Sequence, residues 1–347
     1  AHAEAQEHIA AALKLLKGMP EEGTRLQYEL GLQLIRGVAF ESTLGYMASE
    51  VGDAYDRARE ICELLGHSAE LVPVQLGLYV YNFVRGNYEQ ARDFALRAVD
   101  LSEKADNLVF LIEAYAALGY IDAYLGNLEA ARTELEMCIS LYGSRPEGEE
   151  FPGITAQDPC AAAFAKLPIV LWHLGEVDES ERVMHEAFRM ADRLESPINH
   201  AVVYPHAAWF YSYRGQYDVA LKFANKGMQV CAEYGYDHWY VCSLIHAGIA
   251  MSTQQPSEEG LAMALQGLEH WVTPGARVNC AYFKGRIAWA MHVAGKHEEA
   301  SAMLKEAFGD CEFSNDRLNA SLLYQLRGDM FIEGSSRDAD KAEESWQ

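Results

Sequence analysis

Apolar residues recur along this chain at spacings of three and four positions. One run is Ala91, Phe94, Ala95 and Ala98, and a second occupies 220–228. This spacing places the apolar side chains of each run on one face of a helix. Prolines are few, and no series of short alternating segments indicates strands. The pattern predicts an all-α protein.

Glycine-containing turns separate the helical runs at a regular interval. A Gly-x-x-x-x-Ala/Ser pattern begins at Gly86, Gly126, Gly175, Gly215 and Gly295, and steps of 40 from Gly175 reach Gly215, Gln255, Gly295 and Ser335. Seven positions before the last four stand small residues: Ala208, Gly248, Ala288 and Gly328. Glycine readily adopts the left-handed backbone that ends a helix, and small side chains let two helices cross closely. Both features are typical of tetratricopeptide-type hairpins.

The repeat predicts one domain over 1–347, a right-handed α-solenoid of about eight tetratricopeptide-like hairpins with a period of roughly 40 residues. The hairpins are expected at 24–65, 69–104, 107–144, 158–194, 197–235, 237–272, 274–308 and 315–347, after a lone helix. Because helical pattern reaches both ends, we expect a fragment of a larger multidomain protein. The period breaks only at a loop insertion of about 145–158, interpreted either as a surface insertion or as a flap over the groove.

Charge narrows the range of partners. Lys and Arg total 28 against 51 Asp and Glu, a formal charge of −23, so the field of the protein repels phosphate backbones and anionic membranes. We therefore expect no nucleic acid partner and no membrane partner. The chain lacks both the long apolar stretch of a membrane span and the layout of a signal peptide, which favours a cytoplasmic location.

No motif of catalysis or cofactor binding is evident. The seven cysteines are dispersed and form no CxxC pair, and no two histidines show the spacing of a helical zinc site. The phosphate loop GxxxxGK[ST] and the dinucleotide motif GxGxxG are both absent. We expect no metal, no cofactor and no catalytic residue, and the cysteines are interpreted as small buried apolar residues.

Several short segments, in consistent order and spacing, carry a family resemblance. They are LGYMASEV at 44–51, AYDRARE at 54–60, AQDP at 156–159, EGLA at 259–262 with QGL at 266–268, and GAR at 275–277 with YF at 282–283. Together they resemble the C-terminal repeat region of bacterial class III adenylate or guanylate cyclase fusions that also carry an ATPase. The resemblance implies a sensor region like those of signal-transducing ATPases. Neither enzymatic part is present in this chain.

The hairpin geometry predicts which side chains face the concave groove. In tetratricopeptide stacks, the positions one and about five after the small crossing residue of each first helix point inward. The helix expected around 200–213 is also rich in His, Tyr and Trp, and we include its side chains. The candidates for binding a partner are then aromatic or imidazole side chains: Tyr120, Tyr124, Trp172, His173, Tyr204, His206, Trp209, Tyr213, Trp289 and His292. Ordinary packing remains the alternative for each of them.

Two functions from different classes stay open. The first is a non-catalytic sensor that binds a protein or peptide segment, or a small effector, in the groove and regulates attached ATPase or cyclase domains. The second is a scaffold that self-associates; an enzyme with a site in the groove is a lesser alternative. Arg277, between a turn and a helix, is a candidate anion contact, or else the partner of a nearby acid.

Overall fold

The computed structural model describes residues 2–16, 18–19, 23–44, 46, 48–66, 71–146, 151, 157–253, 255–333 and 339–346. These ranges contain helices and no strand: α1 (His2–Leu16), α2 (Gly23–Leu44), α3 (Ser49–Leu65), α4 (Leu71–Val84), α5 (Tyr88–Lys104), α6 (Leu108–Tyr124), α7 (Leu128–Gly143), α8 (Pro159–His173), α9 (Val177–Leu194), α10 (Pro197–Tyr213), α11 (Tyr217–Tyr234), α12 (Asp237–Thr253), α13 (Glu258–Val272), α14 (Cys280–Val293), α15 (His297–Ser314), α16 (Arg317–Glu333) and α17 (Ala339–Trp346).

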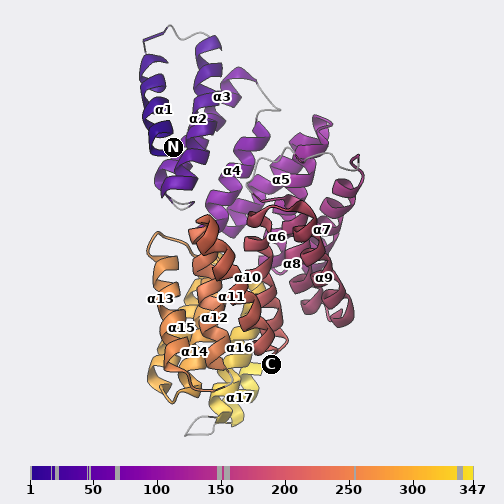
Figure 1. Ribbon diagram of the computed structural model, residues 1–347, viewed down its shortest axis with the longest axis vertical. Coiled ribbons are helices and arrows are strands. Elements are labelled where there is room, and N and C mark those ends of the chain that lie inside the picture. The colour runs from indigo at the N-terminus through magenta and orange to yellow at the C-terminus, as the bar shows by residue number, and fades with distance from the viewer. Residues whose placement is uncertain are drawn as a thin grey trace.

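From α2 onward the helices pair into antiparallel hairpins that stack side by side, with α1 as the lone first helix (Figure 1). The predicted fold class is confirmed: this is a tetratricopeptide-like α-solenoid. Gly86, Gly126, Gly175, Gly215 and Gly295 all have positive φ and end the first helix of a hairpin, as the turn pattern predicted.

The seventh hairpin differs from its predicted bounds of 274–308. Its first helix begins only at Cys280, because Gly275 (φ +102°) and Asn279 (φ +61°) hold the preceding segment in a turn. Its second helix runs on to Ser314 and ends at the left-handed Asn315. Gly309 does not end the helix, since its backbone stays outside the left-handed region.

Small residues sit where helices cross, as the repeat pattern predicts. At Gly248 in α12, an added Cβ would lie 2.5 Å from the amide nitrogen of Ala264 and 2.5 Å from the carbonyl oxygen of Gly260, both in α13. Ala208 of α10 is fully buried against Ala224 of α11 and Ala247 of α12. These contacts bring the backbones of paired helices together without a gap.

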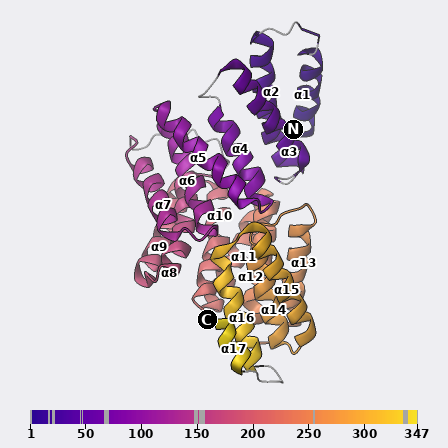
Figure 2. The same cartoon turned by 180° about the vertical axis from the view of Figure 1, so that it is seen from behind.

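The superhelix returns onto itself, so that distant hairpins touch (Figures 1 and 2). The carbonyl of Val84, at the end of α4, accepts hydrogen bonds from the amides of Arg277 and Val278 at 2.8 and 3.1 Å. Asn315 donates to Glu89 of α5 across the same junction, at 2.8 Å. We call this contact between the α4–α7 region and the segments around 277 and 315 the closing contact.

The loop insertion is only partly described. Asp158 caps α8 by accepting hydrogen bonds from the amides of Cys160 and Ala161, and the hydroxyl of Tyr142 donates to the same carboxylate at 2.7 Å. Residues 147–150 and 152–156 lie outside the described residues, and the flap interpretation falls largely on them.

Candidate functional site

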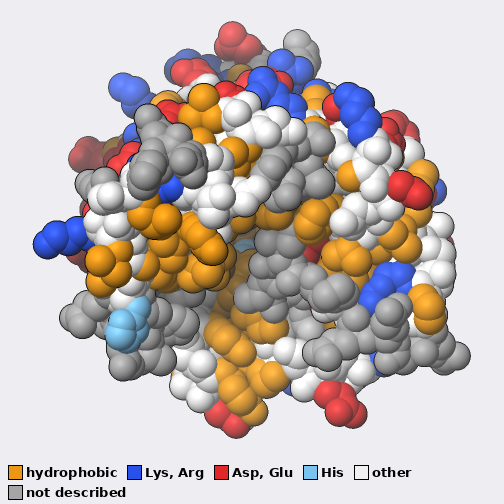
Figure 3. All heavy atoms as spheres, turned by 90° about the horizontal axis from the view of Figure 1, so that it is seen from above, with side chains coloured by type: hydrophobic (Ala, Val, Ile, Leu, Met, Phe, Trp, Pro, Cys, Tyr) orange, Lys and Arg blue, Asp and Glu red, His pale blue; other side chains and the backbone are white. Residues whose placement is uncertain are grey.

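A cavity of about 250 Å³ lies inside the superhelix, on the concave side of the first helices of successive hairpins. We call it the central cavity. Viewed along the long axis from the end with α1–α3, the surface is hollowed near its middle and hydrophobic side chains surround the hollow (Figure 3). The wall comes mainly from α2, α4, α6, α10 and α12, and the segment at Val278 and Asn279 closes one side.

Nine aromatic side chains line this wall. They come from segments far apart in the sequence: Tyr46, Tyr55, Tyr79, Phe83, Tyr120, Tyr124, Trp209, Trp239 and Trp271. Four of these rings form a continuous series: Tyr79 stacks on Phe83 at 5.6 Å between centroids, Phe83 meets Tyr124 at 5.3 Å, and Tyr124 meets Trp209 at 6.1 Å. Such a wall offers large apolar contact area together with hydroxyl and indole groups that fix orientation.

A buried amine lies against two of the aromatic rings of the wall. Lys166 of α8 is fully buried, and its Nζ has no hydrogen-bond partner. The nitrogen lies 3.8 Å from the ring centroid of Tyr124 and 4.3 Å from that of Trp209. Burial lowers the pKa of Lys166 well below its usual range, with the charge of Asp316 acting in the opposite direction. The amine is therefore held mainly by packing against the rings.

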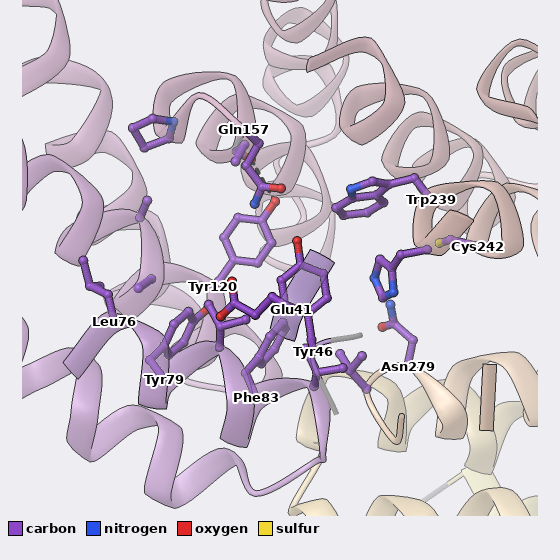
Figure 4. Close-up of a pocket in the computed structure, with 18 of the residues that line it drawn as sticks. Glu41, Tyr46, Leu76, Tyr79, Phe83, Tyr120, Gln157, Trp239, Cys242 and Asn279 are labelled. Carbon is purple, nitrogen blue, oxygen red and sulfur yellow. Dashed lines mark hydrogen bonds between the residues drawn. The ribbon is translucent and has the colours of Figure 1, made fainter. Parts of the chain in front are cut away.

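Two glutamates contribute the acidic character of the cavity. Glu41 of α2 accepts a hydrogen bond from the hydroxyl of Tyr55 at 3.1 Å, and burial raises the pKa of its carboxyl to about 7, against the smaller lowering effect of that bond. Glu113 of α6 is 4% exposed. Glu41, Tyr46 and Tyr120 point toward the middle of the cavity, with Trp239 on the facing wall (Figure 4).

Three histidines line the cavity in their neutral form. Burial lowers the pKa of His206 and His238 to about 4 and that of His246 to about 3. The Nδ1 of His206 donates to the carbonyl of Val202 at 2.8 Å, since a carbonyl only accepts. Its Nε2 is then an acceptor and lies 3.4 Å from the hydroxyl of Tyr120. At neutral pH these rings act as aromatic, weakly polar surface.

The structure places four of the predicted groove residues on the cavity wall: Tyr120, Tyr124, His206 and Trp209. They come from α6 and α10, whose register was set by the turns at Gly126 and Gly215. Trp209 is 2% exposed, and the hydroxyl of Tyr124 donates to the side chain of Asn279.

The other six predicted groove residues do not line the cavity. Tyr204 packs between Phe188 and Phe223, on the face of α10 turned toward α9 and α11. His173 meets the ring edge of Tyr213, whose hydroxyl donates to Asn319 of α16.

The last three of the six have neighbours in other parts of the stack. Trp172 lies beside Arg214, and Trp289 stacks on His292, which contacts His297. Arg277, the predicted anion contact, lies with its guanidinium 4.0 Å above the ring of Phe313.

Several wall residues were not predicted. Applied to the turn at Gly86, the register rule points to Val80 and Val84, and both line the cavity. No local pattern marks Glu41, Trp271 or Asn279, because their place depends on how the superhelix closes.

The described part of the chain holds no group of three or more His, Cys, Asp or Glu side chains placed to bind a metal ion. All seven cysteines are buried and none forms a disulfide, which confirms their predicted packing role. None of the helices in the described ranges combines the length and apolarity that crossing a membrane requires.

Comparison with known proteins identifies the fold. No protein-family model matches the chain, and no curated protein matches it. Among solved structures, it is similar to a Rap protein complexed with the competence and sporulation factor (14% identity, 90% of this chain and 87% of that one, TM-score 0.67). It is also similar to the Rap conjugation regulator of plasmid pLS20 in complex with the Phr* peptide (16% identity, 87% of this chain and 79% of that one, TM-score 0.65).

A third similar structure is a signal transduction ATPase with a tetratricopeptide repeat sensor, PH0952 from Pyrococcus horikoshii (16% identity, 92% of this chain and 45% of that one, TM-score 0.51). The chain has the tetratricopeptide-like solenoid fold. At these identities the similarity establishes the fold alone.

Proposed function

We propose that this chain is a non-catalytic sensor module of a larger signalling protein. In this proposal the central cavity binds a segment of a partner peptide or a small effector, and its occupancy regulates attached ATPase or cyclase domains. The observation that carries the proposal is the aromatic cavity built by the first helices of successive hairpins. Anchoring by Tyr and Trp in an enclosed cavity is typical of ligand and peptide recognition.

The similar structures support the same function. Two of them are Rap proteins in complexes with a peptide or signalling factor, and the third is an ATPase with a tetratricopeptide repeat sensor. The resemblance of the sequence segments to cyclase–ATPase fusions supports the regulated domains named in the proposal. The net charge of −23 supports partners other than nucleic acid.

A ligand screen with a matched pair of tryptophan variants tests the proposal. The chain is screened by thermal shift against pooled hexapeptides and a panel of metabolites. We expect that Trp239→Ala, on the cavity wall, abolishes the shift given by each ligand found. Trp289→Ala should retain it, because Trp289 is another half-buried tryptophan of a first helix but lies outside the cavity. Ligands that depend on Trp289 and ignore Trp239, or the absence of any ligand, would contradict the proposal.

Self-association remains a second candidate, favoured by exposed apolar side chains on the first two helices. Leu15, Tyr28 and Ile35 are 77, 61 and 58% exposed. If they form an interface between copies of the chain, light scattering should show a concentration-dependent oligomer, and Tyr28→Lys with Ile35→Lys should convert it to a monomer. A wild-type monomer at high concentration rejects this candidate.

A further inference from the structure

We propose that the central cavity binds an uncharged aromatic group, one ring on a short apolar stem, and that the wall recognises this group by ring contact and not by charge. This inference rests on the proposed sensor function and names the chemistry of its ligand. The aromatic side chain of a peptide and a small neutral aromatic molecule share this chemistry.

The first argument is that the polar groups of the aromatic wall already have partners in the protein. The hydroxyls of Tyr55, Tyr120 and Tyr124 each donate to an acceptor of the chain itself. The indole of Trp271 donates to the carbonyl of Val278 at 2.9 Å. A donor that already has an acceptor gains little from a polar ligand, whereas its ring still offers apolar surface. These side chains therefore present mainly ring surface to a ligand.

The second argument is that the acids of the wall are engaged. Glu41 accepts the hydroxyl hydrogen of Tyr55 at 3.1 Å, and burial raises the pKa of its carboxyl to about 7, so the loss of its charge costs little at neutral pH. Glu113 is 4% exposed and takes part in an interaction of its own. An ionic ligand would have to compete with these contacts, while an uncharged ligand leaves them in place.

The third argument concerns basic charge. No lysine or arginine is among the cavity-lining residues that the structure describes. Burial keeps the three histidines of the wall neutral at neutral pH. Lys166 lies against the rings of Tyr124 and Trp209 but does not line the cavity, and burial lowers its pKa. A ligand carboxylate would therefore be buried without a cation to pair with it.

The arrangement and size of the wall fit one further ring. Tyr46 and Tyr120 point toward the middle of the cavity, and Trp239 stands on the facing wall (Figure 4). Aromatic rings gain from offset or edge-to-face contact with another ring in addition to burial. About 250 Å³ is at the lower end of small-molecule sites, which span about 300–1,000 Å³. One ring with a short stem fits this scale, and a bulky cofactor does not.

Three probes of one shape test the role of charge. 2-Phenylethanol, phenethylammonium and 3-phenylpropionate are titrated into the full chain at pH 7 by calorimetry and by tryptophan fluorescence. We expect the alcohol to bind at least ten times more tightly than either ion, because only the ions bring a charge into a wall whose polar groups are already engaged.

Two variants locate the bound ring. Trp239→Ala removes a facing ring and should weaken binding of 2-phenylethanol at least tenfold, whereas Trp289→Ala, outside the cavity, should leave it unchanged. Val80→Trp tests the same point without a truncation. Val80 is half-buried on the wall, so a larger side chain there fills the space and should also weaken binding at least tenfold. Thermal melts establish that each variant is folded.

Peptides separate the two sources of the ring. Acetyl-Gly-Phe-Gly-amide is compared with 2-phenylethanol, and acetyl-Gly-Lys-Gly-amide is the charged comparison, which should not bind. Tighter binding of the phenylalanine peptide identifies a peptide side chain as the ligand, and tighter binding of the alcohol identifies a small neutral aromatic molecule. Both outcomes support the inference.

Other outcomes overturn the inference. Equal or tighter binding of either ion or of the lysine peptide, lost in Trp239→Ala, would leave the sensor cavity in place and reject an uncharged ligand. No binding of the alcohol and the phenylalanine peptide, or binding that neither Trp239→Ala nor Val80→Trp weakens, also rejects it. Failure of the sensor proposal itself has a separate sign: the wider screen finds no ligand, or finds ligands that depend on Trp289 and ignore Trp239.

Discussion

The phenol of Tyr124 donates a hydrogen bond of 2.7 Å to the side-chain oxygen of Asn279, a residue 155 positions further along the chain. Tyr124 ends α6, and Asn279 stands in left-handed conformation just before α14. Both residues also line the central cavity. The same pair thus joins two distant parts of the superhelix and forms part of the wall of the site.

Removing this bond should weaken the fold. We expect Tyr124→Phe to lower the free energy of unfolding by about 1 kcal/mol, because the half-buried side chain of Asn279 loses its donor while ring packing is kept. Urea unfolding followed by circular dichroism measures the change. Tyr28→Phe, at an exposed tyrosine, is the control and should be neutral. A neutral Tyr124→Phe would show that water replaces the bond without cost.

The closing contact can be tested at two turn glycines. Gly126 and Gly215 have φ of +80° and +69°, so alanine at either costs about 1–2 kcal/mol in backbone strain. An added Cβ at Gly126 would lie 2.8 Å from the Cβ of Arg317, whereas Gly215 has no atom within 4 Å.

Only Gly126→Ala should therefore push α6 and α16 apart. We expect a larger radius of gyration by small-angle X-ray scattering and a greater loss of stability for Gly126→Ala than for Gly215→Ala. Equal effects of the two substitutions would mean that the closing contact does not hold the superhelix.

The helix crossing at Gly248 is a further test. Gly248→Ala should destabilise the protein by about 1–3 kcal/mol, because the methyl group meets the fixed backbone of Ala264 and Gly260. Gly143→Ala, at the end of α7 with no atom within 4 Å, should be neutral or stabilise by about 0.5–1 kcal/mol. Thermal melts compare the two, and a tolerated Gly248→Ala would contradict close crossing.

The buried amine predicts a pH effect. Burial lowers the pKa of Lys166 in the folded state below its unfolded value of 10.5, so the unfolded chain binds more protons between these values. The contribution of Lys166 to the free energy of unfolding therefore rises with pH between its two pKa values, by about 1.4 kcal/mol per pH unit. Lys166→Met should be more stable than the wild type at pH 7, and its advantage should shrink toward pH 10 in parallel urea titrations. A constant difference would mean that the amine stays charged.

The sequence determined the all-helical solenoid because its signals are local. A glycine at each turn and a small residue at each crossing act within one hairpin, so Gly215 with Ala208 specified α10 without knowledge of the rest. The same register placed Tyr120, Tyr124 and Trp209 on the inner face, and the structure finds them on the cavity wall.

Only the tertiary structure decided where the cavity lies and which side chains meet there. Glu41, Trp271 and Asn279 meet there because small rotations between hairpins add up over the stack until the chain contacts itself. That sum depends on every interface at once, and no single turn or crossing encodes it. Trp289, in the same predicted register as Trp209, lies outside the cavity for the same reason: a local rule sets the face of a helix, but not what stands opposite it.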